Sequence, residues 1–486
     1  MNSHADAAKK RGMEVKMRKY RKTIAMMLMA TLSAALMSGC AGSGDQAASV
    51  QSSSADGGTQ EQTDTAGTVS EASSIETAET GDSGAGKIAY SGGKQTITYW
   101  HTHSDAEEEV LMDQIIPEFE KEYPDITVEA VRMPYDGLMQ QIITSLSSGT
   151  GPDIMRMDII WVPELAQMGA LVPVDDLTGF FDLRQNLYEG PLSTNYYNGK
   201  YYGLPLNTNC LSGIYSKAMM DQLGLTEIPK TYDEVVALKD KLGENQYLIT
   251  TDDTNTWATA PLFYSLGGTY TNDDYSKASG YLNGEDSVKA LQTIVDWYDQ
   301  GIIGPSATGG KPDSANGLYD GDYLFGYQGP WFWSNDEEDN LAKVEGGLLP
   351  SGPAGSRSVV GGEDLVLFNS SEKQEASWVF AMFLMGDFAQ KAQAVGGGHL
   401  IPTVKSVAES EEVQNTPNMS VFIDQLENAV SRTPSPAWNK MSDKITLAFQ
   451  SCIRHEDTPQ HALDQLAPVV DSMLDGTYED TETAEQ

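Results

Sequence analysis

From residue 95 onward, the apolar residues follow a strand spacing and a helix spacing in turn. Gln95–Trp100 is short and rich in Thr, Ile and aromatic residues, which predicts a strand. Ser104 and Glu107 then stand at the spacing of a capping box, so a helix is expected to begin there. The apolar residues of this helix recur at helical spacing and are Met112, Ile115, Ile116, Phe119 and Tyr123.

The same alternation continues to residue 157. Residues 126–130 alternate as in a strand, a helix follows that ends at Gly149, and residues 153–157 predict a third strand. This order of strands and helices predicts a parallel α/β sheet with right-handed crossovers. Ligands of such sheets bind beyond the carboxyl ends of the strands. The loops at 101–104 and 158–161 are therefore expected to border a site.

A second α/β region follows the first. Thr231 and Glu234 form another capping box, and the helix that begins there is expected to continue to Gly243. The spacing of apolar residues predicts three further helices, at 288–298, 376–388 and 463–473. The body of the chain, about residues 94–476, is too long for one hydrophobic core, so two lobes or domains are expected.

The N-terminal segment has the pattern of a secretory signal. A basic cluster at 16–22 precedes an apolar stretch, Ile24 to Met37, that is about half as long as a membrane-spanning helix. The ending at Cys40 resembles the lipobox of bacterial lipoproteins, which implies that Cys40 is acylated and becomes the new N-terminus. A plain secretory signal with an incidental Cys is the alternative. Residues 41–93 are rich in small and polar residues, which predicts a flexible tether.

Charge and cysteine content restrict the function further. The chain has 70 acidic and 31 basic residues and a net charge of −39, which argues against nucleic acid and anionic lipid as partners. We interpret the excess of acidic residues as a surface that keeps the protein soluble outside the cell, in preference to an acidic site for cationic ligands. Cys210 and Cys452 are expected to be two buried free thiols, with a disulfide as the alternative.

The order of several motifs resembles the family 1 extracellular solute-binding proteins of ATP-binding cassette importers, and most closely the maltose- and maltodextrin-type sugar binders. The similarity spans nearly all of residues 95–475. The motifs that carry it are Trp100, Glu118-Phe-Glu-Lys-Glu-Tyr-Pro124, Gly151-Pro-Asp-Ile154, Ala166-Gln-Met-Gly-Ala-Leu-Val-Pro173, Tyr202-Gly-Leu-Pro205, Ile214-Tyr-Ser-Lys217, Pro229-Lys-Thr-Tyr-Asp-Glu234, Gly329-Pro-Trp-Phe-Trp-Ser-Asn335 and Leu348-Leu-Pro-Ser-Gly352.

The resemblance implies a two-lobed periplasmic-binding-protein-like α/β fold with a ligand cleft between the lobes. Crossovers between the lobes are expected near 206–209, 351–355 and 397–402. The implied organisation is a signal peptide at 1–40, a tether at 41–93, the first lobe at 94–206 and 355–398, the second lobe at 207–354 and 399–476, and an acidic tail at 477–486.

The function implied is that of an extracellular lipoprotein that captures a disaccharide or oligosaccharide and delivers it to the permease subunits of an importer. The protein is expected to be a monomer without catalytic activity, anchored through Cys40 to the outer face of the membrane of a Gram-positive type cell. Two alternatives remain open. The same fold could bind a non-sugar solute, such as an amine or an iron chelate held by tyrosines (Tyr196, Tyr197 and Tyr201), or the chain could be a tethered glycosidase.

Carbohydrate recognition needs flat aromatic faces and a hydrogen-bond partner for each buried hydroxyl. The resemblance places a stacking aromatic residue at Trp331, with Trp333 assigned to the core instead, and further aromatic residues at Trp257 and Trp438. On the first lobe, Asp158 and Trp161 match the ligand-facing loop. Asn209 lies at the expected hinge, where the resemblance implies a polar residue at the ligand. Weaker candidates for polar contacts are His103, Asn255 and Glu363.

Signals for other chemistry are poor. His101 and His103 follow a strand, but no third His or Cys stands at metal-ligand spacing. The sequence has no nucleophile elbow and no phosphate-binding Gly-rich loop, and pairs of carboxylates are expected by chance in so acidic a chain. No metal or cofactor is therefore predicted.

Overall fold

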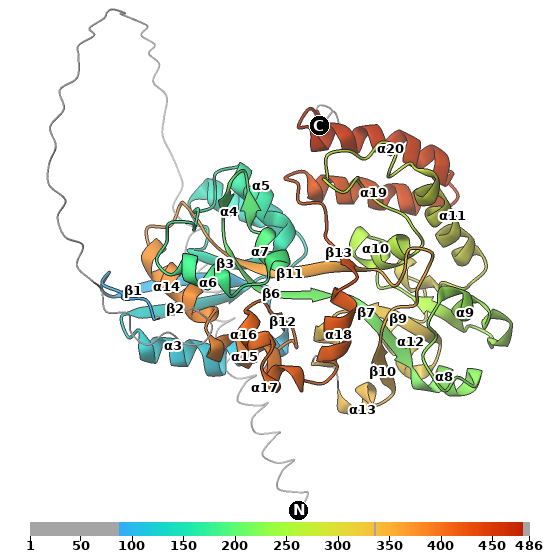
Figure 1. Cartoon of the computed structure of the whole chain (residues 1–486), viewed down its shortest axis with the longest axis horizontal. Coiled ribbons are helices and arrows are strands. Elements are labelled where there is room, and N and C mark those ends of the chain that lie inside the picture. Colours follow the sequence, from blue (N-terminus) through green and yellow to red (C-terminus); the bar gives the residue numbers. More distant parts are fainter. Residues whose placement is uncertain (1–86, 335–336, 480–486) are drawn as a thin grey trace, which may run out of the picture. The chain divides into compact units, whose positions relative to one another are not determined.

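The structure, a computed structural model, describes residues 87–334 and 337–479. The predicted signal segment, Cys40, the tether up to residue 86 and the last residues of the acidic tail lie outside the described residues. The described part forms two α/β lobes, each with its own sheet (Figure 1). The predicted fold class, a two-lobed α/β protein, is confirmed.

The first lobe is built on a sheet in which the strands predicted near the start of the body form one end. β1 pairs in parallel with β2 and with β3, while β11 runs antiparallel to β3 and β6. Among the described residues the sheet has seven strands in the order β12-β6-β11-β3-β1-β2, with β13 paired to β11. Their bounds are β1 Gln95–His101, β2 Ile126–Arg132, β3 Ile154–Asp158, β6 Leu204–Cys210, β11 Ser358–Leu367, β12 Ile401–Pro402 and β13 Ala429–Val430.

Helices cover both faces of this sheet because its strands are apolar on both sides. Ile154 and Leu365 belong to the core on one face, and the neighbouring Met155 and Val366 belong to the core on the other. The first core receives α2 (Asp105–Val110), α3 (Ile116–Glu122), α6 (Phe180–Gln185), α7 (Glu189–Ser193), α14 (Gln374–Leu384), α15 (Asp387–Gly396), α16 (Lys405–Ala408), α17 (Glu411–Gln414) and α18 (Met419–Leu426). The second core receives α4 (Leu138–Ser148) and α5 (Val162–Gln167).

The second lobe has a four-stranded sheet in the order β10-β7-β9-β8. Tyr215 and Phe325 point to its larger core, whereas Ile214 and Tyr323 point to a smaller core on the other face. The strands are β7 Ser212–Ser216, β8 Tyr247–Thr250, β9 Tyr323–Gln328 and β10 Val344–Gly347. The helices are α8 (Lys217–Leu223), α9 (Tyr232–Val236), α10 (Thr256–Ser265), α11 (Glu285–Asp299), α12 (Ser314–Asp320), α13 (Glu338–Leu341), α19 (Trp438–Ile453) and α20 (Pro459–Leu474).

Within the described residues the chain changes from one core to the other three times. The first change lies between Cys210 and Leu211, and the second lies within β11, whose Val359 packs in the second lobe and Leu365 in the first. The third lies between Phe422 and Trp438. The first two fall a few residues after the expected crossovers.

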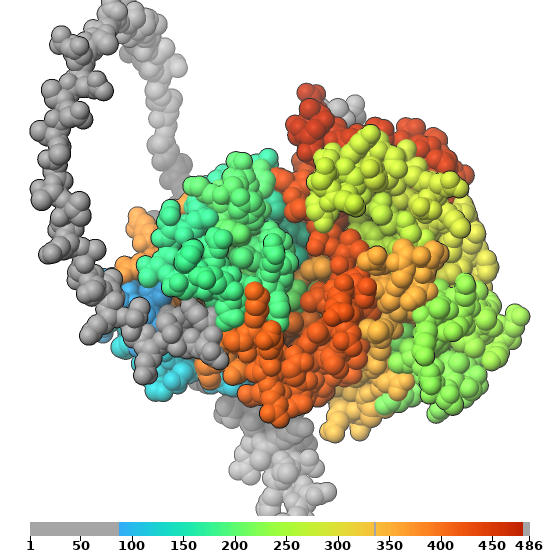
Figure 2. Space-filling model, viewed as in Figure 1, coloured from blue at the N-terminus to red at the C-terminus, as the bar shows by residue number. Residues whose placement is uncertain are grey.

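The third change differs clearly from the boundary expected at 397–402. Ile401–Pro402 does not leave the first lobe but adds an edge strand to β6, and the short helices that follow pack on the first core. Lys405 donates its backbone N–H to the carbonyl of Asn186, which ties this segment to the first lobe. Figure 2 shows the orange segment after residue 400 adjoining the green segment near residue 190.

Two predicted helices differ in detail. The helix capped by Ser104 contains a π-helical turn, Leu111–Ile115, that adds a residue to one turn. This turn places Leu111 in the core and leaves Met112, which was expected there, 46% exposed. The helix capped by Thr231 ends at Val236 and is followed by a short 3-10 turn, although both predicted capping boxes are present.

The ends of the body and its cysteines complete the fold. Residues 87–93, predicted as tether, contact the first lobe, where the backbone N–H of Ile88 donates to the hydroxyl of Tyr123 at 3.2 Å. Cys210 and Cys452 are buried free thiols, as predicted. No helix in the described part of the chain is long and apolar enough to cross a membrane.

Candidate functional site

An ion pair joins the two lobes at the carboxyl end of β3. Asp158 is the last residue of this strand, and both of its carboxylate oxygens accept from the guanidinium of Arg432, at 2.7 and 3.3 Å. Arg432 follows β13, and the side chains of this pair are only 7% and 14% exposed. The hydroxyl of Tyr135 donates to Asp158 at 2.8 Å. This junction lies where the topology predicted a site.

Two indole rings of the second lobe meet the same arginine. Trp257, in the first turn of α10, and Trp331, in the turn Pro330–Trp333, are stacked with ring centroids 6.5 Å apart and planes inclined by 27°. The guanidinium carbon of Arg432 lies 5.1 Å from the ring centroid of Trp257, within cation–π distance. Ring faces, a cation and a carboxylate therefore converge at one place.

Strand β11 passes close to this cluster because it has glycines at its centre. A Cβ at Gly361 would lie 2.2 Å from Oδ1 of Asn209 and 2.6 Å from the ring of Trp257. Gly362 has φ of +145°, a conformation that other residues avoid. Oδ1 of Asn209 and Nε of Arg432 are buried without a partner among the described residues. The cluster thus contains one buried acceptor and one buried donor whose hydrogen bonds the described residues do not supply.

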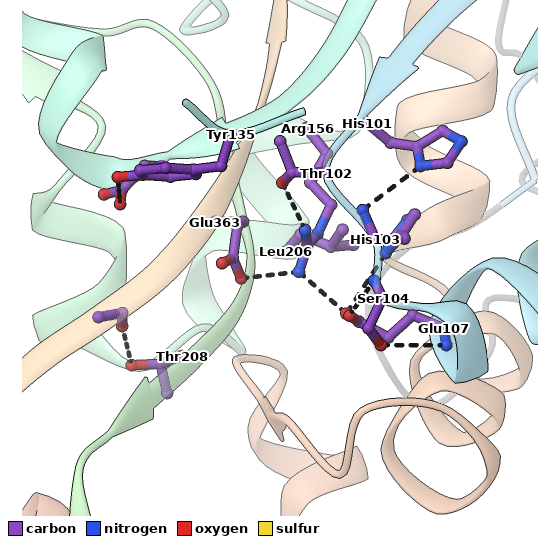
Figure 3. A network of polar contacts seen from close by, with 12 residues as sticks. His101, Thr102, His103, Ser104, Glu107, Tyr135, Arg156, Leu206, Thr208 and Glu363 are labelled. Atoms are coloured by element: carbon purple, nitrogen blue, oxygen red, sulfur yellow. Dashed lines mark hydrogen bonds and ion pairs between the residues drawn. The ribbon is translucent and has the colours of Figure 1, made fainter. Parts of the chain in front are cut away.

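A chain of buried charges lies beside the cluster, inside the first lobe. Arg156 of β3 contacts Glu107 and Glu363, each at 2.9 Å, and donates to the hydroxyl of Thr102 at 2.8 Å (Figure 3). Nδ1 of His103 lies 3.3 Å from Oε1 of Glu107. A charge buried as deeply as that of Arg156, which is 3% exposed, has to be paired, and these contacts pair it.

Burial and neighbouring charges shift the protonation of this chain. Burial, reinforced by Glu107 and Asp158 against the opposing effect of Arg156, raises the pKa of Glu363 to about 7. Burial and the charge of Arg156 lower the pKa of His103 to about 4, so this imidazole is neutral near neutral pH. Burial alone would raise the pKa of Glu107, but Arg156 and His103 lower it below its usual range. One carboxyl of the chain therefore titrates near neutral pH.

Five of the residues named from the sequence lie at this junction. Trp331, Trp257 and Asp158 form the aromatic and ionic contacts, Asn209 borders them, and Glu363 stands opposite Asp158 in the antiparallel pairing of β11 with β3. We call Trp257, Trp331, Arg432, Asp158 and Asn209 the junction cluster.

Four others lie elsewhere in the structure. Trp161, 4% exposed, packs against Tyr135 in the core beside α4, and Trp438, 2% exposed, packs against Tyr270 in the second lobe. Both indoles are buried in this structure, and the stacking role expected of Trp438 and the ligand-facing position expected of Trp161 stay predictions. The side chain of Asn255 caps α10, and His103 belongs to the buried charge chain.

Neither arginine was predicted from the sequence, and neither was Tyr135. Arg156 carried a usable signal, because a charged residue inside the apolar strand Ile154–Asp158 must find a buried partner. Arg432 lies in a loop, where no local sequence pattern predicts a buried partner. Tyr196, Tyr197 and Tyr201, the alternative ligands for a chelate, belong to the hairpin β4 (Tyr196–Tyr197) and β5 (Lys200–Tyr201), and their described ring contacts are with one another, Phe180 and Arg184.

Within 87–334 and 337–479, no three His, Cys, Asp or Glu side chains gather so that they could hold a metal ion. His101 and His103 have ring centroids 4.9 Å apart, and burial lowers the pKa of both.

Two α/β lobes that share crossing strands, with aromatic and charged residues where they meet, define the class of two-lobed ligand-binding proteins. Residues 114–421 match the model of one family, described as bacterial extracellular solute-binding protein. The chain belongs to this family, and the resemblance found in the sequence is confirmed.

Curated relatives and solved structures agree with this assignment. The chain is 22% identical to a maltotriose-binding protein of Pyrococcus abyssi, over 76% of this chain and 79% of that protein. It is also 22% identical to a galactooligosaccharide-binding protein of Bacillus subtilis, over 75% and 86% of the two chains. The GacH receptor of Streptomyces glaucescens has the same fold, with a TM-score of 0.71 and 22% identity over 79% of this chain and all of that one. A solute-binding protein of Thermotoga lettingae, solved with α-D-tagatose, gives a TM-score of 0.70 and 26% identity over 78% of this chain and all of that one.

Proposed function

We propose that this protein captures a carbohydrate, a disaccharide or an oligosaccharide, between its two lobes and delivers it to the permease of an ATP-binding cassette importer. The observation that carries the proposal is the junction cluster. Stacked indoles match the apolar C–H faces of a sugar ring, while Asp158, Arg432 and Asn209 supply acceptors and donors for its hydroxyls.

The similar proteins support a sugar as the ligand. Two curated relatives are named for oligosaccharides, and similar structures were solved with acarbose, α-D-tagatose and maltose. The sugars in these names differ, so the similar proteins support a carbohydrate without singling out one sugar for this chain.

Binding and closure are coupled through the contacts that cross the junction. Arg432 reaches Asp158, and Nδ2 of Asn439 donates to Glu164 at 2.8 Å, so both bonds join the two lobes. A ligand favours the closed arrangement only as far as it binds that arrangement better than the open one. A sugar that stacks on Trp331 and bonds to Asp158 contacts both lobes at once, which provides this difference.

The same proposal places the protein outside the cell on a lipid anchor. Its support is the sequence around Cys40, where a basic and apolar segment ends in small residues followed by Cys, together with the family assignment. A Cys40→Ala substitution should accumulate unprocessed precursor and release the protein from the membrane fraction. A Cys40→Ala protein that stayed membrane-bound without precursor would contradict the anchor while leaving sugar binding untouched.

Calorimetric titration of the chain with a panel of disaccharides and oligosaccharides tests the central proposal. We expect saturable binding of at least one sugar, and a ligand present at a hundredfold excess over its Kd should stabilise the fold by about 2.7 kcal/mol. Chromatography of the sugar after incubation should show it unchanged. A panel without binding, or a bound sugar that is hydrolysed, would contradict the proposal.

A further inference from the structure

A shallow groove on the first lobe lies apart from the junction cluster. Its volume is about 530 Å³, and none of its lining residues belongs to that cluster. One wall is the exposed side of α4, whose residues 137, 140, 141, 144 and 148 share a helical face at spacings of three and four. The residues that line it are Trp100, Gly137, Gln140, Gln141, Thr144, Ser145, Ser148 and Thr150.

The chemistry of this lining is uniform. All eight residues are uncharged, in a chain whose net charge is −39. The side chains of Gln140, Gln141 and Trp100 have no hydrogen-bond partner in the described part of the chain, so their N–H groups and amide oxygens are available. The hydroxyls of Thr144 and Ser148 donate to carbonyl oxygens of their own helix, at 2.8 and 3.1 Å, and keep their lone pairs as acceptors.

Trp100 provides the aromatic part of the groove. It stands near the end of β1 on the sheet face opposite Tyr99 and is half-buried against the core that α4 covers. An indole beside a row of amide and hydroxyl groups combines an apolar surface with many hydrogen-bond partners. This combination suits a sugar chain, whose rings have apolar faces and hydroxyl rims.

From this lining we propose that the groove is a second carbohydrate site, which holds a neutral polysaccharide on the outer surface of the first lobe. The ligand is neutral because the lining has no Lys or Arg to pair with a carboxylate, sulfate or phosphate, and no acid to pair with an amine. It is a polymer because the wall formed by α4, 11 residues and therefore about 16 Å long, is open and longer than a single sugar unit. The site keeps the protein on the polymer from which its transported sugar is released.

The test measures retention of the purified full chain on insoluble neutral polysaccharides: starch granules, microcrystalline cellulose and an insoluble β-glucan. A saturating soluble sugar from the titration panel occupies the junction cluster throughout. The test variant is the double substitution Gln141→Ala/Thr144→Ala. Its matched control is Gln292→Ala/Thr293→Ala on α11, where the threonine hydroxyl also donates to its own helix at 2.8 Å.

We expect retention on at least one polysaccharide, a loss of fivefold or more for the α4 variant, and none for the α11 variant. Soluble sugar should titrate identically with all three proteins. Lack of retention by the unchanged protein, or equal retention by the α4 variant, would overturn the proposal of a second site. Neither result would contradict sugar binding at the junction cluster. Retention lost in Trp331→Ala but kept in the α4 variant would show that the polymer binds at the junction instead.

Discussion

Two arginine–carboxylate pairs lie next to each other on β3 and β11, and they differ in what they connect. Glu363 and Asp158 are direct partners across these strands, yet Glu363 pairs with Arg156 of the same lobe and Asp158 pairs with Arg432 beyond the lobe junction. Arg156 contacts a second carboxylate and a hydroxyl, whereas Arg432 lies against the ring of Trp257.

We therefore call Arg156 and Glu363 the structural pair. We call Arg432 and Asp158 the exchangeable pair, because a ligand or water can replace one partner of this pair. If Arg156 were removed, the carboxylate of Glu107, whose side chain is 6% exposed, would remain buried in the first lobe without this cationic partner. Arg432 lies in the segment that crosses between the lobes and contacts Trp257 of the second lobe, so we expect its pair with Asp158 to exchange for water when the lobes separate. We infer that the first pair maintains the fold and that the second contributes to ligand binding and closure.

Arg156→Ala should give the largest effect on stability. Breaking a buried ion pair by removing one partner costs about 3–5 kcal/mol, and two buried carboxylates lose their partner here. Arg432→Ala is the matched control and should cost less than about 1 kcal/mol. Urea unfolding followed by circular dichroism measures both values. Equal losses in the two variants would show that the two pairs do not differ as inferred.

Trp331→Ala should give the largest effect on binding, about 2–4 kcal/mol, as truncation of a central aromatic contact does. Titration with the best sugar of the panel measures it. Trp333 is the control. Its ring packs edge-to-face on Phe332, with the ring centroids 5.5 Å apart, and it contacts one core of the first lobe and the smaller core of the second lobe. Trp333→Ala should lower Tm and leave the affinity nearly unchanged. The reverse outcome would exchange the roles assigned to the two indoles.

The pKa of Glu363 makes the structural pair sensitive to pH. Because burial raises this pKa from 4.5 to about 7, the folded protein binds a proton more tightly than the unfolded chain does. The resulting stabilisation is complete below pH 4.5 and is lost as the pH rises to about 7. It amounts to about 2–3 kcal/mol.

Glu363→Gln removes this titration and keeps the shape of the side chain. The difference in unfolding free energy between the unchanged protein and this variant should therefore fall by about 2–3 kcal/mol from pH 4.5 to 7.5. The histidines titrate in both proteins, so their contribution cancels. Urea unfolding across this pH range measures the difference, and a difference independent of pH would place the pKa of Glu363 near its ordinary value.

Sequence and structure agree most closely where the interacting residues are close in the chain. Both capping boxes join residues three positions apart, and the predicted strands of the first lobe lie side by side at one end of its sheet. Arg432 and Asp158 are 274 positions apart, and no local spacing connects them. The burial of Trp438 could not be predicted for the same reason, because it depends on Tyr270 and on α11, which are distant in the chain.

Asp158→Asn should have the smallest effect and separates charge from shape at the exchangeable pair. The amide still accepts from Tyr135 and from a guanidinium N–H, so the fold should keep its Tm. A hydrogen bond to a charged group is worth about 1.5–3 kcal/mol, and a neutral one about 1 kcal/mol. Affinity for the best sugar should therefore fall by about 1–2 kcal/mol in titration, with a changed order of preference among sugars that differ in one hydroxyl. Asp153→Asn is the matched control, since this carboxylate pairs with Lys373 and Ser371 elsewhere on the lobe. If Asp158→Asn lost more affinity than Trp331→Ala, the charge rather than the stacked rings would dominate binding, and the junction would be chiefly an ionic site.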